Sequence, residues 1–355
     1  MSILNTLYDL IVRFTSWIWG IPILIVLIGG GIILTLIING IQFTKPGFII
    51  RNTIGKKEDK PLEDGEISPL QGMVAALAAT VGTGNIVGVG VAIAMGGPGA
   101  MFWIWVSGFL AMAIKYSEVT LSCYYRQPDG EGGYKGGPYM YIKDGLNNKP
   151  LAIFFGIMML ICLTVICGVH ASSISSNLGT LGIPSFVSAA IMIAFVVLVI
   201  FGGMQSLVKI TSKLVPVMTF LYLGIATVII VLNITRIGDV ISSIFTGAFT
   251  GWAAVGGFTG AALSRTVRYG LARGVFSNDA GLGLTAAVQS QVKNIGHPAR
   301  QGTWAVIETF IDTILICTLS GFVILFTGVW TGGGDGSTFA VESFTAQLGQ
   351  VGGVI

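Results

Sequence analysis

Long apolar runs dominate the chain, and polar positions gather in the short segments between them. Each run is near the roughly 20 residues that a helix needs to cross a bilayer. Eight such runs occur, at 17–40, 70–95, 99–124, 151–178, 184–203, 207–232, 240–264 and 303–330. The pattern predicts an all-α polytopic membrane protein with about eight spans.

Composition supports this class. Hydrophobic residues make up 53% of the 355 residues and charged residues 10%, with a mean hydropathy of +0.83. A soluble domain carries about 25% charged residues. The sequence lacks Ser-His-Asp, HExxH, P-loop and dinucleotide-binding patterns and has only two histidines, so we expect no enzyme activity. Its basic residues are scattered over loops, which gives no support for nucleic-acid binding.

The basic residues also predict an orientation. If the loop 41–67 is cytoplasmic and the loops alternate from there, all of the 19 Lys and Arg except Arg13 and Arg236 lie on the inner side. This bias predicts an external N-terminus in the plasma membrane. Long inner loops are expected at 126–150 and 265–302.

The second apolar run is interrupted near its middle by Thr80-Val81-Gly82-Thr83-Gly84-Asn85. Non-helical backbone at membrane depth is tolerated only inside protein or beside water. Glycine eases unwinding, and the threonine and asparagine side chains can serve as ligands. The alternative is an unbroken helix whose glycines allow close packing.

A second glycine-rich stretch, at 251–260 in the seventh run, strengthens the first interpretation. Two interrupted helices in corresponding positions of two repeats indicate a transporter binding site. Runs two and seven lie five spans apart and have opposite directions in the predicted orientation. The pattern therefore favours a transporter core over a simple helical bundle.

Four motifs resemble the alanine or glycine:cation symporters, a family with the fold of the bacterial leucine transporter. They are AATVGTGNIVG at 78–88, GGPGAMFWIWVSG at 96–108, RGVFSNDAGLG at 273–283 and FIDT at 310–313. Ile104 stands where the family signature usually has methionine. The resemblance implies an extra N-terminal helix at 1–40, a cytoplasmic linker at 41–67, a first five-helix repeat at 68–232 and an incomplete second repeat at 233–355. The last helices of that repeat are expected to be missing.

The resemblance also implies a site at the two breaks. The substrate carboxylate is expected at the amides of Thr83, Gly84 and Asn85, where the helix dipole adds positive potential. The substrate ammonium is expected near the carbonyls of Ala254, Val255, Gly256 and Gly257. The co-transported ion, Na⁺, is expected at the carbonyls of Ala78, Thr80 and Val81 with the side-chain oxygen of Asn85.

His170 lies inside the fourth run, where an ionisable group is a functional candidate. It stands where the family typically has glutamine, and Ser172 where it has asparagine. His170 is therefore a candidate for binding the substrate side chain. The alternative is a histidine hydrogen-bonded between helices.

Two carboxylates of the eighth run, Glu308 and Asp312, are four residues apart and share a helix face. We expect Glu308 to pair with Arg300 or another basic loop residue near the inner interface. Asp312 lies deeper and is a candidate for ion or proton coupling. Lys115 and Glu118 are expected to form a structural pair.

Three hypotheses follow. The first is that the chain is a sodium-coupled symporter of a small neutral amino acid, alanine or glycine, which works by alternating access. The second is that the same fold couples transport to protons, a role that Asp312 and His170 would support. The third hypothesis is a truncated membrane remnant that does not transport.

Overall fold

The computed structural model describes residues 3–18, 21–55, 66–130, 133–180, 182–250, 259–334 and 336–349. Almost all of them are helical. The described strands are β1 (Gln127–Pro128) and β2 (Tyr134–Lys135), which form one short antiparallel hairpin. The prediction of an all-α chain is confirmed.

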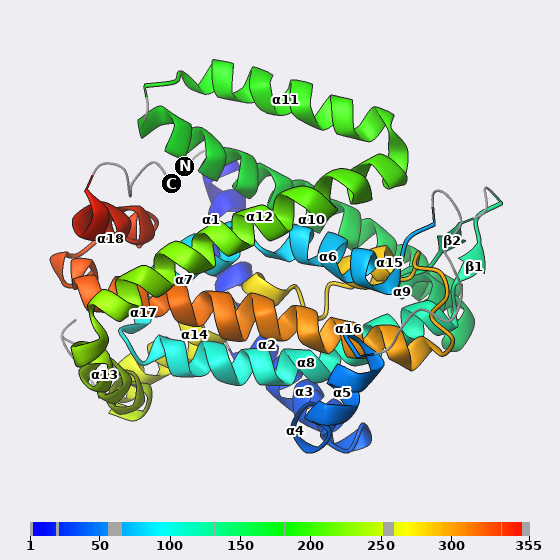
Figure 1. The fold of residues 1–355 in the computed structure, drawn as a ribbon, viewed down its shortest axis with the longest axis horizontal. Helices are drawn as coiled ribbons and strands as arrows, with labels where there is room; N and C mark the ends of the chain where they lie inside the picture. Colours follow the sequence, from blue (N-terminus) through cyan, green and yellow to red (C-terminus); the bar gives the residue numbers. More distant parts are fainter. Residues whose placement is uncertain are drawn as a thin grey trace.

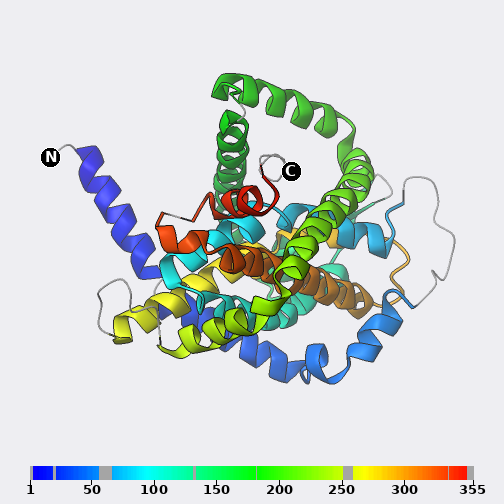
Figure 2. The same ribbon diagram turned by 60° about the vertical axis from the view of Figure 1, so that its left-hand side comes forward.

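The helices form a central bundle with an arch on one side (Figure 1). The bundle consists of α6 (Pro69–Thr80), α7 (Thr83–Gly96), α8 (Ala100–Tyr124), α14 (Thr259–Asn278), α15 (Leu284–Gln289), α16 (Pro298–Thr309), η5 (Phe310–Ile316) and α17 (Cys317–Thr327). The arch consists of α10 (Lys149–Thr180), α11 (Ser185–Phe201) and α12 (Gly203–Leu232). Figure 2 shows the arch side-on and α1 (Ile3–Ile18) pointing away from the bundle.

Shorter elements connect these parts. They are α2 (Ile21–Leu24), η1 (Ile25–Gly29), α3 (Gly30–Ile37), α4 (Ile41–Thr44), α5 (Pro46–Asn52), α9 (Pro138–Met140), η2 (Tyr141–Gly145), η3 (Ile234–Arg236), α13 (Ile237–Thr250), η6 (Val329–Gly332) and α18 (Phe339–Leu348).

The first apolar run differs from its prediction as one helix over 17–40. Residues 3–18 form the separate helix α1, and the helical stretch that begins at Ile21 ends at Ile37. A turn follows in which Asn39 and Gly40 both have positive φ, 54° and 56°. These two residue types tolerate the left-handed conformation that ends a helix.

The broken helix predicted in the second run is confirmed. α6 and α7 are bent by 42° at their junction. α6 begins with a capping box, in which the Gln71 amide donates to Ser68 Oγ (3.1 Å) and the Ser68 amide donates to Gln71 Oε1 (2.9 Å).

Among the described residues, four helices are long and apolar enough to cross a membrane, or five if the bent pair counts as one span. The four lie at Ala100–Tyr124, Lys149–Ser176, Ser206–Leu232 and Pro298–Thr327. The prediction of eight spans is not confirmed by this count. The helices at Ile25–Ile37 and Ser185–Phe201 are apolar but shorter.

The predicted seventh span, 240–264, differs from the structure at its end. Helix α13 ends at Thr250, and α14 begins at Thr259 and continues to Asn278. The inner loop expected from residue 265 therefore begins only after α14. Arg265, Arg268 and Arg273 belong to this helix. They therefore do not count as residues of an inner loop in the predicted orientation. Hydropathy alone missed α14 because its arginines interrupt the apolar pattern.

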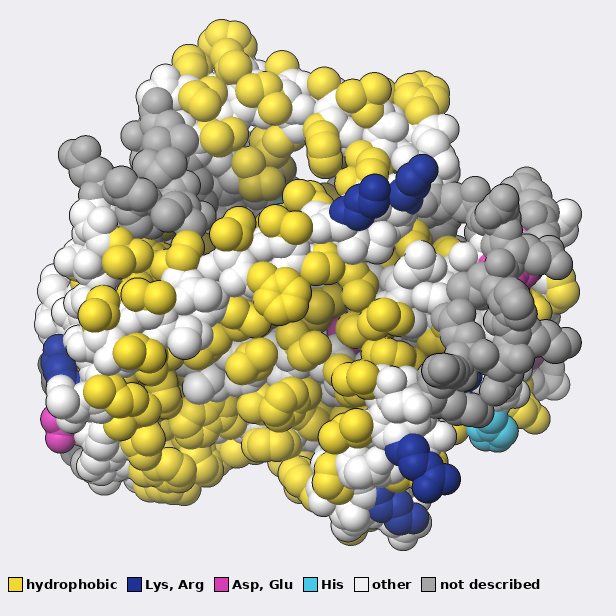
Figure 3. All heavy atoms as spheres, viewed as in Figure 1, with side chains coloured by type: hydrophobic (Ala, Val, Ile, Leu, Met, Phe, Trp, Pro, Cys, Tyr) yellow, Lys and Arg dark blue, Asp and Glu magenta, His cyan; other side chains and the backbone are white. Residues whose placement is uncertain are grey.

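The surface of the arch is strongly apolar. In the 18-residue apolar window of Lys149–Ser176, only 6% of the residues are buried, against 61% for Pro298–Thr327. Hydrophobic side chains cover much of the face shown in Figure 3. Apolar side chains on the outside and polar ones inside are what a lipid environment requires.

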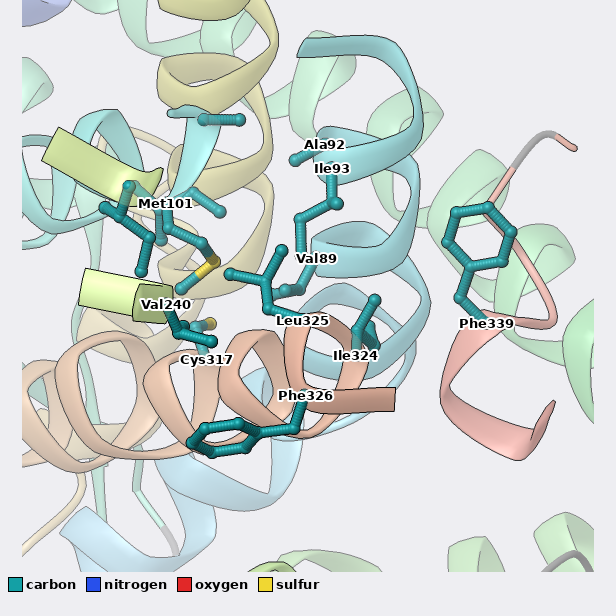
Figure 4. Packing of buried hydrophobic residues seen from close by; sticks show 13 residues of the cluster. Val89, Ala92, Ile93, Met101, Val240, Cys317, Ile324, Leu325, Phe326 and Phe339 are labelled. Carbon is teal, nitrogen blue, oxygen red and sulfur yellow. The ribbon is translucent and has the colours of Figure 1, made fainter. Parts of the chain in front are cut away.

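The largest apolar cluster of the bundle joins helices that are distant in sequence. Val89 and Ile93 of α7 pack with Met101 of α8, Ile324 of α17 and Phe339 of α18 (Figure 4). In lipid, such contacts stabilise by close packing rather than by removal from water.

Small residues bring α14 against α8. Gly270 and Gly274 are four apart on one face of α14. A Cβ built on Gly270 would lie 2.6 Å from the Ala100 carbonyl oxygen, and one on Gly274 would lie 2.6 Å from Ser107 Cβ. The two backbones therefore approach as closely as glycine allows.

Replacing Gly270 by leucine is expected to force α14 away from α8. Overpacking of this kind costs about 1 to 3 kcal/mol, measured as the free energy of unfolding in mixed micelles. Gly224→Leu on α12 is the matched control, because nothing lies within 4 Å of a Cβ built there. An equal loss of unfolding free energy in the two variants would contradict close packing of α14 against α8 at Gly270.

Candidate functional site

The junction between α6 and α7 rearranges the backbone hydrogen bonds. The Gly82 amide, which in an unbroken helix would donate to the Ala78 carbonyl, donates instead to Asn85 Oδ1 (3.0 Å). The Asn85 amide donates to the Gly82 carbonyl (3.3 Å). The break thus exposes carbonyls at the end of α6 and amides at the start of α7.

Thr83 adds a polar group at the same place. Its hydroxyl oxygen is buried and has no hydrogen-bond partner among the described residues. Buried polar groups are normally paired, and an exception calls for an explanation. An unpartnered hydroxyl beside the first amides of a helix suits a bound anionic group.

Asn85 is the centre of a fully buried polar cluster. Its Nδ2 donates to Ser277 Oγ, to the Asp312 carbonyl and to Asp312 Oδ1, each at 2.9 Å. Asn85 and Asp312 are both 0% exposed. One asparagine thereby connects the start of α7 with the end of α14 and with η5.

The Asp312 carboxylate has three side-chain donors. Besides Asn85, the hydroxyl groups of Ser277 (2.8 Å) and Thr313 (2.9 Å) donate to Asp312 Oδ2. Cys317 Sγ lies 3.3 Å from Ser277 Oγ. Asp312 sits on η5, a π-helical segment, and such segments occur frequently at functional sites.

A second break follows α14. The helix ends at Asn278, and Asp279, Gly281 and Gly283 have positive φ values of 53°, 91° and 72° before α15 begins at Leu284. The glycines allow this left-handed backbone. This turn interrupts the helical stretch from Thr259 to Gln289. The predicted interruption, with Ala254, Val255, Gly256 and Gly257, lies outside the described residues.

The two breaks meet in space. A Cβ built on Gly84 would lie 3.1 Å from the Phe276 carbonyl oxygen and 3.2 Å from Ser277 Cα. Beyond this meeting point α7 packs against α14, and α6 packs against α15. Two interrupted helices therefore cross side by side, each with one half on either side of the polar cluster.

His170 of α10 also reaches the first break. A Cβ built on Gly82 would lie 3.7 Å from His170 Cε1. The structure thus brings together the predicted residues around Gly82, Asn85, His170 and Asp312, although their roles in binding remain predictions.

The other charged pairs differ from the sequence predictions. Glu308 does not pair with Arg300, which donates to the carbonyls of Asn52 (3.2 Å) and Asn294 (3.4 Å). Glu308 pairs with Lys115 at 3.1 Å, and both side chains are buried. The expected Lys115–Glu118 pair is thus replaced by a pair between α8 and α16, because the lysine points across the helix interface.

Sequence reasoning missed Ser277, Thr313 and Cys317 as members of the cluster. Ser277 stands in the motif at 273–283, where glycines at 281 and 283 follow polar residues. That spacing was a usable signal for a second break. Thr313 and Cys317 carry no comparable signal.

Comparison with known proteins places this architecture in a family. The profile of the sodium:alanine symporter family matches residues 4–355. The chain belongs to this family. The family resemblance predicted from the four motifs is confirmed.

Individual relatives agree with the assignment. The chain is 41% identical over 345 residues to the uncharacterized transporter YflA of Bacillus subtilis, which covers 96% of this chain and 73% of the relative. It is 35% identical over 368 residues to the sodium/alanine symporter AgcS of Methanococcus maripaludis, covering 100% of this chain and 78% of the relative. The probable sodium/glutamine symporter GlnT of Bacillus subtilis is 34% identical over 332 residues, 90% of this chain and 67% of the relative.

Membership of this symporter family identifies the chain as a membrane protein of cation-coupled amino-acid transport. It points to a transporter rather than an enzyme. The exposed apolar helices and the buried polar cluster agree with this assignment.

Proposed function

We propose that the chain transports a small neutral amino acid, alanine or glycine, together with sodium. The single observation that supports this most strongly is the meeting of two broken helices, α6–α7 and α14–α15, at Asn85, Ser277 and Asp312. Half-helix ends at such a crossing provide opposite partial charges for a zwitterion and a cation. Alternating access then moves the helix halves around this fixed point.

The substrate carboxylate is proposed to bind at the start of α7. The Thr83 and Gly84 amides lie in the first turn, and the unpartnered Thr83 hydroxyl lies beside them. The substrate ammonium is proposed to face carbonyl oxygens of the second core helix. The end of α14, where the Phe276 carbonyl approaches Gly84, offers such oxygens besides the predicted segment 254–257.

Sodium is proposed to bind where hard oxygen donors converge. These are the carbonyls of Ala78, Thr80 and Val81 at the end of α6, Asn85 Oδ1 and the Asp312 carboxylate. Asn85 Oδ1 already accepts from Gly82, and its second lone pair leaves room for an ion. A carboxylate balances the charge of the bound cation in the low-dielectric interior.

Proton coupling is the second candidate. A Bacillus subtilis relative, 34% identical over 333 residues, is described as a putative sodium/proton-dependent alanine carrier. Asp312 at the crossing and His170 beside Gly82 are groups that can exchange protons. On this proposal the same cluster takes a proton in place of sodium.

His170 is proposed to contact the substrate side chain. It approaches the first break from α10, and its imidazole can donate or accept a hydrogen bond. The plasma membrane, with an external N-terminus, is the proposed location.

Uptake of labelled alanine into proteoliposomes tests the function. We expect uptake driven by an inward sodium gradient, and a loss of about 100-fold in Asn85→Ala, equivalent to about 2.7 kcal/mol. Asn52→Ala is the matched control, because the Asn52 side chain donates to the Phe48 carbonyl of its own helix, and the substitution keeps the backbone carbonyl that accepts from Arg300. Uptake driven by a proton gradient alone would favour the second candidate, and uptake by neither gradient would contradict both.

A further inference from the structure

The face of α16 and η5 that bears Asp312 also bears Glu308, one helical turn away. The two carboxylates contact different halves of the broken helices. Asp312 accepts from Asn85 at the start of α7 and from Ser277 at the end of α14. Glu308 contacts the opposite side of the crossing, where α6 and α15 lie.

Glu308 begins a continuous chain of buried polar side chains, which we call the inner polar chain. Lys115 Nζ of α8 lies 3.1 Å from Glu308 Oε1, and Gln289 Nε2 of α15 donates to Glu308 Oε2 at 2.7 Å. Gln301 Nε2 of α16 then donates to Gln289 Oε1 (2.8 Å) and to the Pro69 carbonyl of α6 (3.3 Å). All four side chains are at most 1% exposed.

Stability alone is a weak reason for such a chain. Well-packed apolar residues in place of a buried ion pair are often as stable. Directional hydrogen bonds do what apolar contacts do not, because they fix one relative position of the elements that they join. Here they join α6 and α15, which are the halves of the broken helices on the predicted inner side, to the helix that carries Asp312.

The hydrogen-bond pattern of the helix changes between the two carboxylates. Glu308 lies in α16, whereas Asp312 lies in the π-helical η5. A π-helical turn holds an extra residue, so its hydrogen bonds can return to the α pattern with a change of register.

We propose that the inner polar chain transmits the occupancy of the site at Asp312 to α6 and α15. Lys115, Glu308, Gln289 and Gln301 are then positioning residues, which do not touch the transported solutes but set the position of the inner helix halves. This inference rests on the proposed sodium-coupled transport. It adds the route by which the bound site controls the opposite end of both broken helices.

Hydrogen exchange of the full chain in nanodiscs tests the proposal. The measured quantity is the exchange rate of backbone amides in residues 66–80, with and without sodium and alanine, beside the alanine affinity from calorimetry. Gln301→Met cuts the chain at α6 and Gln289→Met cuts it at α15, each with a side chain of similar length. Thr303→Val is the matched control, because this buried hydroxyl bonds only to its own helix, at the Arg300 carbonyl (2.7 Å).

In the wild type and in Thr303→Val, sodium with alanine is expected to change the exchange rate of residues 66–80 by about tenfold or more. In Gln301→Met and Gln289→Met this response disappears, sodium-driven uptake falls at least about tenfold, and the alanine affinity stays within about threefold of wild type. Binding retained with the response lost is a result that a merely structural role does not produce.

Three results overturn the proposal. The exchange response persists in both glutamine variants, or alanine binding falls in parallel with uptake, or both variants fail to fold while Thr303→Val folds. A wild-type chain that neither binds alanine nor responds to it refutes the proposed function itself. That outcome is distinct, because it is seen before any variant is compared.

Discussion

Asp312→Asn is expected to abolish sodium-driven alanine uptake, with a fall of at least about 100-fold. The asparagine keeps the size of the side chain but removes the negative charge proposed to balance the cation. It also replaces one of the two accepting oxygens, Oδ1 opposite Asn85 or Oδ2 opposite Ser277 and Thr313, with an NH₂ group that donates. Uptake into proteoliposomes and the sodium concentration for half-maximal uptake are the measurements.

Asp239→Asn on α13 is the matched control, because that carboxylate is exposed on the same chain. Its uptake is expected to equal that of the wild type. Circular dichroism of both purified variants separates a lost site from a lost fold. Full sodium-driven uptake by Asp312→Asn would refute the coupling role of this carboxylate.

Lys115→Met is expected to lower the free energy of unfolding by about 3 to 5 kcal/mol. Lys115 and Glu308 are 0% and 1% exposed, so the variant leaves a buried carboxylate without its counter-ion. The Lys115 ammonium also contacts the Thr285 hydroxyl of α15, and that contact is lost as well. Unfolding by denaturant in mixed micelles, followed by tryptophan fluorescence, measures the change.

Two further variants make this test specific. Lys115→Met combined with Glu308→Gln is expected to be more stable than Lys115→Met alone, because the uncompensated charge is gone. Lys143→Met is the control for an exposed pair. Lys143 and Asp144 lie 3.6 Å apart but are 34% and 32% exposed, so its loss costs at most about 1 kcal/mol. A similar loss of unfolding free energy in Lys115→Met and Lys143→Met would contradict the role of burial in the Lys115–Glu308 pair.

The two carboxylates of the eighth run show why their environments, rather than their spacing, determine their roles. Both were predicted on one face, and this is where they lie. Asp312 is surrounded by neutral donors from the two breaks, whereas Glu308 is neutralised by a lysine. In the proposed mechanism, the first arrangement leaves a negative charge for an ion, and the second connects helices α8 and α16.

Much of the candidate site was predictable because its signals are local. The glycines and Asn85 in the middle of an apolar run indicated the first break, and the depth of Asp312 in its run indicated a functional carboxylate. The predicted second break, with Ala254 to Gly257, lies outside the described residues. The break that the structure describes, after α14, was not predicted. Asp279, Gly281 and Gly283 supply the turn, but they follow a helix whose arginines conceal its position in the bundle.

The membrane class, the family and the first broken helix could be predicted from sequence, since they depend on the length of apolar runs and on motifs within single segments. The contacts of Asn85 with Ser277 and Asp312, which are 192 and 227 residues away, depend on the tertiary structure. So does the pairing of Lys115 with Glu308 rather than with Glu118, its neighbour on the same helix. Helical periodicity places a side chain on a face, but the partner of that face depends on how distant helices pack, and no local pattern records this.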